Sequence, residues 1–128
     1  MLHLSCHCGA ARLTVDSPPA ELTNCNCSIC RRLAGLWGYY LHAQVHWLSP
    51  PDAVESYIQG DRTLRTLRCR TCGCTMSSEP LEPDRYPRMG VNMRNADPAE
   101  LGTPRIRLLD GADTWNACYW EDLPTQDR

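Results

Sequence analysis

Nine cysteines, most of them gathered in three short boxes, constrain this chain more than any other feature of its sequence. Two cysteines in a C-x-C pair lie too close for an easy mutual disulfide, and the odd total leaves one thiol over. Thiolates two or three positions apart can instead supply two corners of a zinc tetrahedron from one turn. The spacing therefore predicts zinc sites rather than a disulfide framework. The boxes are "CHC" at 6–8, "CNCSIC" at 25–30 and "CRTCGC" at 69–74.

The ligand count predicts two zinc ions per chain with different roles. Four thiolates from two distant pairs make a closed structural site, whereas three leave a position for water or substrate, as in catalytic zinc sites. The closed site is expected to use Cys6, Cys8, Cys69 and Cys72, and the open site is expected to use Cys25, Cys27 and Cys30. The alternative is that Cys74 or Cys118 closes the middle box into a second inert site.

Length and composition indicate a small protein of short elements. A chain of 128 residues has the length of one domain, and we expect residues 1–128 to form a single one. Ten prolines, eight glycines and no phenylalanine favour short strands and turns over long helices. No run approaches the roughly 20 apolar residues of a membrane span, and the first residues lack both a basic start and an apolar signal core. The sequence therefore predicts a cytoplasmic, reducing location and no membrane partner, which also disfavours disulfides.

Hydrophobic alternation predicts several strands and one short helix. Residues 36–49 are rich in aromatic and β-branched side chains and alternate along their second half, which is typical of a strand with one buried face. Residues 54–60 and 63–69 flank "GD" at 60–61, which predicts a hairpin that brings Cys69 to the metal. Residues 104–109, before "DG" at 110–111, predict another strand. Only residues 28–35 are expected to be helical, with the helix ending at Gly35.

The order of the cysteine boxes follows a known pattern. A C-x-C-S-x-C-R-[RK]-x-x-G box matches "CNCSICRRLAG" at 25–35, and a C-x-x-C-G knuckle matches "CRTCGC" at 69–74. Openings similar to "GSCHCG" match "LSCHCGAARL" at 4–13, and weaker similarities follow at 89–98 and 121–124. The chain thus resembles, nearly end to end, the glutathione-dependent formaldehyde-activating enzyme (Gfa) family, which also includes centromere protein V.

This resemblance implies a fold and a division of the zinc ligands. The implied fold is all-β, a compact set of small coiled sheets with little helix, similar to the Mss4-like β-tent and stabilised by zinc. The family's structural zinc falls on the first and third boxes of this chain, and its reactive zinc falls on the middle box. The implied catalytic residues are Cys25, Cys27 and Cys30.

The implied reaction is that of a carbon–sulfur lyase acting on adducts of the S-(hydroxymethyl)glutathione type. The expected partners are therefore a small thiol such as glutathione and a small carbonyl compound. An open zinc can lower the pKa of an incoming thiol, so that the nucleophilic thiolate exists at neutral pH. A second possibility is a transient mixed disulfide, with Cys27 as the central candidate. Cys74 departs from the family, whose members usually carry serine or threonine there, and it could act as a fourth ligand or a resolving thiol.

Charged and polar neighbours of the middle box are candidates for substrate binding. Arg31 and Arg32 directly follow Cys30, where they could stabilise thiolates or hold a glutathione carboxylate, although either could simply be solvated. By their place in the family, Asn92 and Arg94 are expected to border the pocket.

Four other conspicuous residues are expected to have structural roles only. We expect His42 and His46 to share one exposed strand face, since the cysteines already account for both metals. Trp115 is interpreted as core packing and Cys118 as a small buried apolar residue.

Charge separates the remaining function classes. The formal net charge is −2, and filling a four-thiolate and a three-thiolate zinc site lowers it to roughly −5. An acidic domain without a basic tail binds phosphates poorly, so nucleic acid is not an expected partner. The alternative to an enzyme is a non-catalytic zinc-binding module that interacts with another protein.

Overall fold

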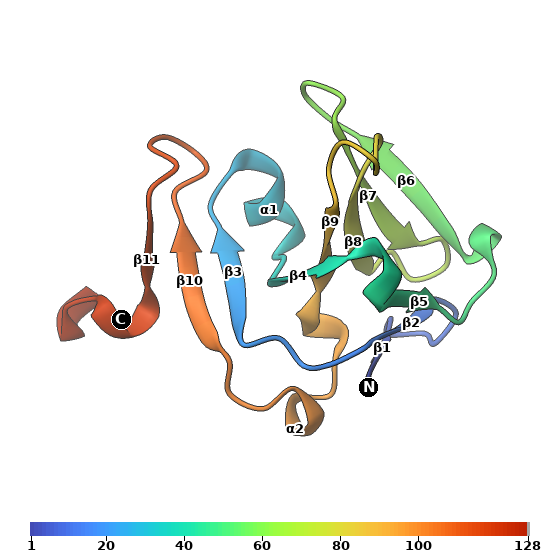
Figure 1. The fold of residues 1–128 in the computed structure, drawn as a ribbon, viewed down its shortest axis with the longest axis horizontal. Coiled ribbons are helices and arrows are strands. Elements are labelled where there is room, and N and C mark those ends of the chain that lie inside the picture. The colour runs from blue at the N-terminus through green and yellow to red at the C-terminus, as the bar shows by residue number, and fades with distance from the viewer. Residues whose placement is uncertain (128) are drawn as a thin grey trace.

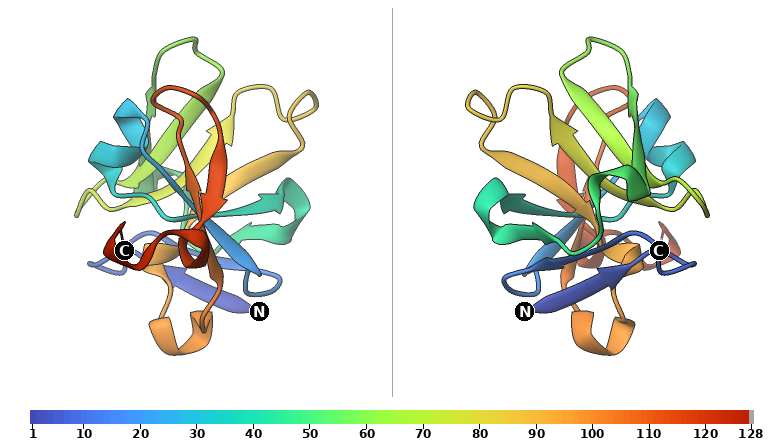
Figure 2. Two further views of the ribbon diagram at one scale, coloured as in Figure 1. Left: turned by 90° about the vertical axis from the view of Figure 1, so that its left-hand side faces the viewer. Right: turned by 90° about the vertical axis from the view of Figure 1, so that its right-hand side faces the viewer.

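Residues 1–127, the part of the chain that the structure describes, form two β-sheets with little helix (Figures 1 and 2). The structure is a computed structural model. Its α-helices within this range, α1 (Ser28–Leu33) and α2 (Pro98–Leu101), are both short. The expected all-β fold with little helix is therefore confirmed.

The smaller sheet contains the N-terminal strands. Its strands are β1 (Leu2–Ser5), β2 (Arg12–Val15) and β5 (Val45–Trp47), with β2 in the middle and both pairs antiparallel. Strict alternation along β1 places Leu2 and Leu4 inward and leaves His3 and Ser5 exposed, so this sheet has one buried face.

The larger sheet has eight strands, and of its pairs only β10 with β3 is parallel. Leu109 at the end of β10 lies directly opposite Cys25 at the end of β3, which brings two distant segments to one edge. In pairing order the strands are β11 (Ala117–Tyr119), β10 (Arg105–Leu109), β3 (Glu21–Cys25), β4 (Trp37–Leu41), β9 (Arg88–Asn92), β8 (Thr75–Pro80), β7 (Leu64–Cys69) and β6 (Val54–Ile58).

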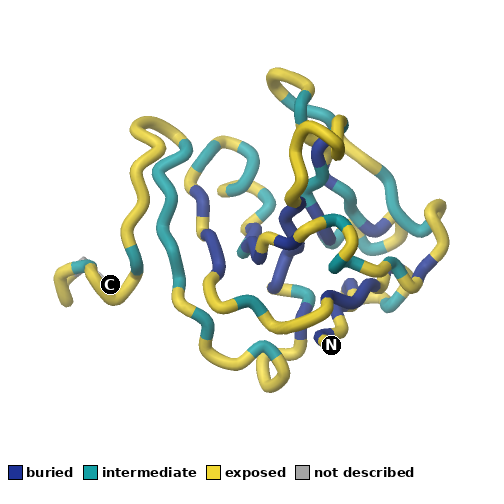
Figure 3. Tube along the Cα trace, viewed as in Figure 1, coloured by how far each residue is buried: buried dark blue, intermediate teal, exposed yellow. Residues whose placement is uncertain are grey.

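The hydrophobic core joins the two sheets. Leu4 and Leu13 of the smaller sheet and Met76 and Val91 of the larger one belong to a single buried cluster. Buried segments accordingly gather around β1, β2, β4 and β9, whereas at the other end of the large sheet β10 is half-buried and β11 is largely exposed (Figure 3). Each fully buried aliphatic side chain stabilises the fold by about 1.5–3 kcal/mol, so this core fixes how the sheets sit on each other.

The predicted single strand at 36–49 is wrong. β4 ends at Leu41, a 3₁₀ turn covers His42–Gln44, and β5 continues in the other sheet. The Oε1 atom of Gln44 accepts a hydrogen bond of 2.9 Å from the backbone N–H of Leu41, which stabilises the turn. The chain thereby crosses from one sheet to the other, and the two histidines do not share a strand face.

The two histidines of this segment bond to different partners. His42 Nε2 lies 2.9 Å from the carbonyl oxygen of Tyr86, and His46 Nε2 lies 2.8 Å from Oδ1 of Asp16. Neither histidine joins a group of metal-ligand atoms within residues 1–127.

Two of the sequence expectations about elements are confirmed, and one is refined. β6 and β7 form the expected hairpin, in which Val54 lies opposite Cys69, and β10 covers most of 104–109. The helix after the middle cysteine box ends as Ala34, not Gly35, adopts the left-handed conformation with a φ of 52°. Gly35 is required for another reason, because a Cβ there would lie 2.4 Å from Cζ2 of Trp37.

Candidate metal centres

The first group of cysteine sulfurs has the dimensions of a zinc tetrathiolate. The sulfurs of Cys6, Cys8, Cys69 and Cys72 all lie within 4.8 Å of one another. Cys8 Sγ is 3.7 Å from Cys6 Sγ and 3.6 Å from Cys69 Sγ. Four thiolates bonded to zinc at about 2.3 Å lie about 3.8 Å apart, so these residues fit the ion. Two of them come from the turn after β1 and two from the end of β7, so an ion here would link the two sheets.

Backbone N–H groups point at the sulfurs of this first group. Ala11 N donates to Cys6 Sγ at 3.2 Å, and Cys72 N donates to Cys69 Sγ at 3.5 Å. Hydrogen bonds from the N–H groups of Cys74 and Cys8 lower the pKa of Cys72 to about 5. Hydrogen bonds of this kind favour thiolates, which are the form that binds metal.

The second group consists of the three sulfurs of Cys25, Cys27 and Cys30, which also lie within 4.8 Å of one another. Cys25 ends β3, and Cys27 is the N-cap of α1. Cys27 N donates to Cys25 Sγ at 3.4 Å, and Cys30 N donates to Cys27 Sγ at 3.5 Å. The Cys27–Cys30 turn repeats the geometry of the Cys69–Cys72 turn, so both are shaped as metal-binding knuckles.

Crowding makes these three thiols unequal. Burial opposes ionisation of Cys27, but hydrogen bonds from Cys30 and Ile29 lower its pKa overall. The pKa of Cys30 is raised to about 12, mainly by burial and in smaller part by the neighbouring sulfurs. Burial also raises the pKa of Cys25. A divalent cation would remove this conflict by stabilising all three thiolates together.

Neither of the two remaining cysteines joins the second group within residues 1–127. Cys74 lies beside the first group, where its thiol interacts with Cys72 and accepts a hydrogen bond from the backbone of His7. Cys118 is on the edge strand β11 opposite Leu108 and is exposed, so the expectation of a buried residue is wrong. The triplet therefore has no fourth cysteine in this structure.

A cavity of about 240 Å³ opens beside the triplet. Its floor is a row across four adjacent strands, in which Tyr39, Gly90, Ser78 and Thr66 lie directly opposite one another in turn. Residues opposite each other on neighbouring strands face the same side, so the small members of this row leave a hollow. Figure 1 shows α1 between β3 and the β7–β9 part of the sheet, as this lining requires.

Two tryptophans line this cavity in different ways. Trp37 is 3% exposed, and its indole Nε1 is the one buried side-chain nitrogen or oxygen without a hydrogen-bond partner in the described part of the chain. It nevertheless lies near enough to the Cys30 sulfur to lower the pKa of that thiol in part. Trp115 is 67% exposed, so its interpretation as core packing is wrong. Instead, its ring forms an outer wall of the cavity.

The loop that carries Trp115 is held against the middle cysteine box. Asn26 Nδ2 donates to Asp110 Oδ1 at 3.0 Å, and Asn26 Oδ1 accepts from Ala112 N at 2.9 Å. Hydrogen bonds from Asn26 and Thr114 also hold the pKa of Asp110 below its usual range. Trp115 has a φ of 62°, a conformation that non-glycine residues rarely adopt unless the surroundings impose it.

The predicted substrate contacts lie in three different settings. Arg31 borders a shallow hollow that Cys27 and Gly111 also line. Arg32 donates a hydrogen bond of 2.7 Å to the carbonyl oxygen of Ser28. Both arginines are exposed, and neither lines the cavity. Asn92 is buried, with its side chain bonded to the backbones of Leu36 and Thr75.

Arg94 also bonds to backbone, at Ala34, and Asn92 and Arg94 are both absent from the cavity lining. The cation that does line the cavity is Arg88, at the start of β9. Nothing in the local sequence around Arg88 marks it, because only the pairing of β9 with β4 brings it to the cavity.

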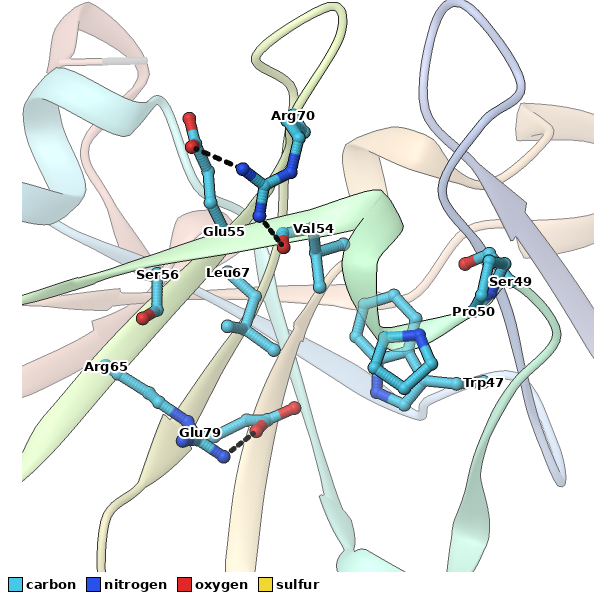
Figure 4. Close-up of a pocket in the computed structure, with 11 residues that line it drawn as sticks. Trp47, Ser49, Pro50, Val54, Glu55, Ser56, Arg65, Leu67, Arg70 and Glu79 are labelled. Carbon is cyan, nitrogen blue, oxygen red and sulfur yellow. Dashed lines mark hydrogen bonds and ion pairs between the residues drawn. The ribbon is translucent and has the colours of Figure 1, made fainter.

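A larger groove of about 630 Å³ lies elsewhere, between strands β6–β8 and the segment from Trp47 to Pro51 (Figure 4). Its charged side chains pair with each other: Arg70 lies 3.7 Å from Glu55, and Arg65 lies 3.3 Å from Glu79. The groove contains no cysteine and no residue of the triplet. Size alone therefore does not identify the reactive site, and the smaller cavity beside the sulfurs is the better candidate.

No helix in residues 1–127 is both long and apolar enough to cross a membrane.

Known proteins resemble this chain in sequence and in fold. A family model described as glutathione-dependent formaldehyde-activating enzyme matches residues 1–108. A Halomonas elongata protein, named provisionally as such an enzyme, is 51% identical over 43 residues, which is 33% of this chain and 27% of that protein. The matched segment thus spans about a quarter of that relative's length. A crystal structure of a Rhodobacter sphaeroides protein is similar with a TM-score of 0.67 and 25% identity, covering 82% of this chain and 99% of the other.

Proposed function

Because the chain belongs to the glutathione-dependent formaldehyde-activating enzyme family, we propose that it is a zinc-dependent carbon–sulfur lyase that makes and cleaves adducts of a small thiol with a small carbonyl compound. The observation that carries this proposal is the contrast between the two cysteine groups. One has four sulfurs, enough to enclose an ion, while the other has three and borders a cavity.

The proposed reaction is the addition of a thiol to a carbonyl. The sulfur forms a bond to the carbonyl carbon, the π-electron pair moves to oxygen, and the proton released by the thiol ends on that oxygen, giving a hemithioacetal. The reverse reaction breaks the same carbon–sulfur bond. When bound to Cys25, Cys27 and Cys30, zinc supplies a positive centre that lowers the pKa of an incoming thiol.

The residues of the cavity would hold the reactants. Trp37, Leu109 and the ring of Trp115 provide apolar walls that reduce contact with water on the side of the triplet. The small floor residues Gly90 and Ser78 leave room for the thiol and the carbonyl compound. Bringing two reactants together in one geometry is itself a large part of catalysis for an addition of this kind.

Glutathione and formaldehyde are the substrates that the family name suggests, and we propose adducts of the S-(hydroxymethyl)glutathione type for this chain. The alternative is a non-catalytic zinc module that binds another protein. Its support is the exposed apolar surface among the residues that line the cavity, of which Tyr39 and Leu64 are 46% and 41% exposed. The two functions differ in whether a free thiol binds at the triplet.

Replacement of Cys27 tests the proposal. We expect Cys27→Ser to reduce the zinc content from two ions per chain to one and to abolish binding of glutathione, while the fold is kept. Metal analysis and calorimetric titration with glutathione measure the two effects. The matched control is Cys118→Ser, which removes an exposed cysteine outside both groups and should change neither.

An unchanged zinc content in Cys27→Ser would remove this residue from the metal site. Wild-type protein that holds two zinc ions but binds no glutathione would instead favour the protein-binding module.

A further inference from the structure

We propose that Arg88 selects the thiol substrate by binding a carboxylate on it, so that the site prefers short anionic thiols over neutral ones. This inference rests on the proposed function, because it concerns the same cavity. It names the specificity-determining residue and the chemical class of the thiol.

The residues that line the cavity include a positively charged side chain but no negatively charged one. Arg88 is the one arginine or lysine among its lining residues, which include no aspartate or glutamate. Five other arginines of the described chain lie within 4.0 Å of a carboxylate, whereas Arg88 has no such partner among residues 1–127. Its nearest recorded contact is the ring of Tyr39, with the guanidinium carbon 5.8 Å from the ring centroid. Arg88 is itself exposed at the rim of the cavity, where a guanidinium without a counter-ion is available to an anionic ligand.

The size of the cavity limits how far the carboxylate lies from the sulfur. Its volume of about 240 Å³ is below the range of roughly 300–1,000 Å³ that is usual for ligand sites. A Cβ at Gly90 would already lie 3.3 Å from the Trp37 ring, so even the floor has little spare room. Only a short thiol-bearing arm can therefore be enclosed, with the rest of a larger molecule outside the exposed ring of Trp115.

The geometry assigns the two ends of such an arm. The sulfur end lies at the triplet, on β3 and α1, and the carboxylate end lies at Arg88, across the sheet on β9. Arg31 and Arg32, which follow the triplet in sequence, do not line the cavity and are not expected to contribute. A cysteine-derived thiol with a carboxylate a few bonds from sulfur fits this arrangement.

The test uses two thiols of similar size, 3-mercaptopropionate, which carries a carboxylate, and 2-mercaptoethanol, which does not. Zinc-loaded wild type and the variants Arg88→Gln and Arg31→Gln are titrated with each by calorimetry, after metal analysis. We expect wild type and Arg31→Gln to bind 3-mercaptopropionate about tenfold or more tightly than 2-mercaptoethanol. Arg88→Gln should bring this ratio close to one by weakening only the anionic thiol.

Each of the following results would overturn the proposal. A preference for the anionic thiol that survives in Arg88→Gln would assign it to another residue. If Arg88→Gln keeps its zinc but binds both thiols more weakly by the same factor, Arg88 supports the shape of the cavity and does not select the charge of the thiol. Wild type that binds glutathione but neither of these thiols, or that binds both equally, would remove only the inference, whereas wild type that binds none of the three would remove the proposed function as well.

Discussion

Gly111 shows how closely single residues constrain the reactive site. A Cβ on this glycine would lie 2.6 Å from Cys25 Sγ and 3.2 Å from Cys27 Cβ. Real carbon atoms do not approach a sulfur this closely, so the loop after β10 packs directly on the triplet only because this residue has no side chain. The "DG" turn predicts a change of direction here, but its second role depends on a contact 86 residues away in sequence from Cys25 and is invisible locally.

We therefore predict that Gly111→Ala weakens zinc binding at the triplet without removing a ligand. The added methyl group must displace the Cys25 sulfur or the loop, which lowers the second zinc occupancy and thiol binding, while the first group keeps its ion. Metal analysis after mild dialysis against a chelator measures the loss. Ala112→Ser, at the exposed neighbouring position, is the control and should resemble wild type. Full retention of both ions in Gly111→Ala would mean that this contact is not tight.

Residue-level reasoning from sequence succeeded where chemistry is local and failed where it depends on packing. The spacing of the cysteines was enough to separate a group of four from a group of three, because neighbouring thiolates share one turn. Trp115 and Cys118 were both assigned to the interior, since apolar residues are usually buried. Both lie on the exposed end of the large sheet, where no element of the described chain covers them.

At the scale of elements, two turns supply the sulfurs of the first group. The turn after β1 supplies Cys6 and Cys8, and the β7–β8 connection supplies Cys69 and Cys72. β1 belongs to the small sheet and β7 to the large one, so the ion would cross-link sheets that are otherwise joined by the shared core. The hairpin that delivers Cys69 follows from the "GD" turn, which is why the sequence could predict it.

We expect Cys69→Ser to destabilise the whole fold and Cys27→Ser to do so much less. Loss of a structural ion removes a link between the sheets and should lower the free energy of unfolding by several kcal/mol, since binding of structural zinc adds directly to folding. The triplet lies at the end of β3 and in α1, where it joins fewer elements. Thermal unfolding of both variants in the presence of zinc compares them. Equal destabilisation would contradict the division into structural and reactive sites.

The broken strand at 36–49 shows what alternation cannot reveal about elements. The expected alternation covers the second half of this segment, and of that half β5 is the strand that shows it, with Val45 and Trp47 half-buried and His46 exposed. Burial along β4 does not alternate, and a side-chain hydrogen bond from Leu41 N to Gln44 stabilises the turn that takes the chain from β4 into the other sheet. Hydrophobic residues alternate with a period of two along any half-buried strand, so the alternation does not show that the chain has passed from one sheet to the other. The sequence therefore predicted the strands and missed the change of sheet.

The cavity beside the triplet exists only at the scale of the whole molecule. Its floor needs the register of four strands, which places Tyr39, Gly90, Ser78 and Thr66 in one row, and its rim needs Arg88 from the start of β9. None of these residues belongs to a cysteine box, so neither spacing nor composition pointed to them. The two cysteine groups could be predicted because the boxes are contiguous, and the lining of the cavity could not because strand pairing assembles it.

The central claim is that one metal ion is enclosed by four cysteines while a second has three and an open position beside the cavity. Anomalous diffraction at the zinc edge from crystals of the zinc-loaded protein tests it most directly. The expected maps show one ion bonded to the sulfurs of the first group, and one bonded to Cys25, Cys27 and Cys30 with a fourth ligand from solvent or an added thiol. A fourth protein ligand at the second ion, or no ion beside the triplet, would contradict the claim.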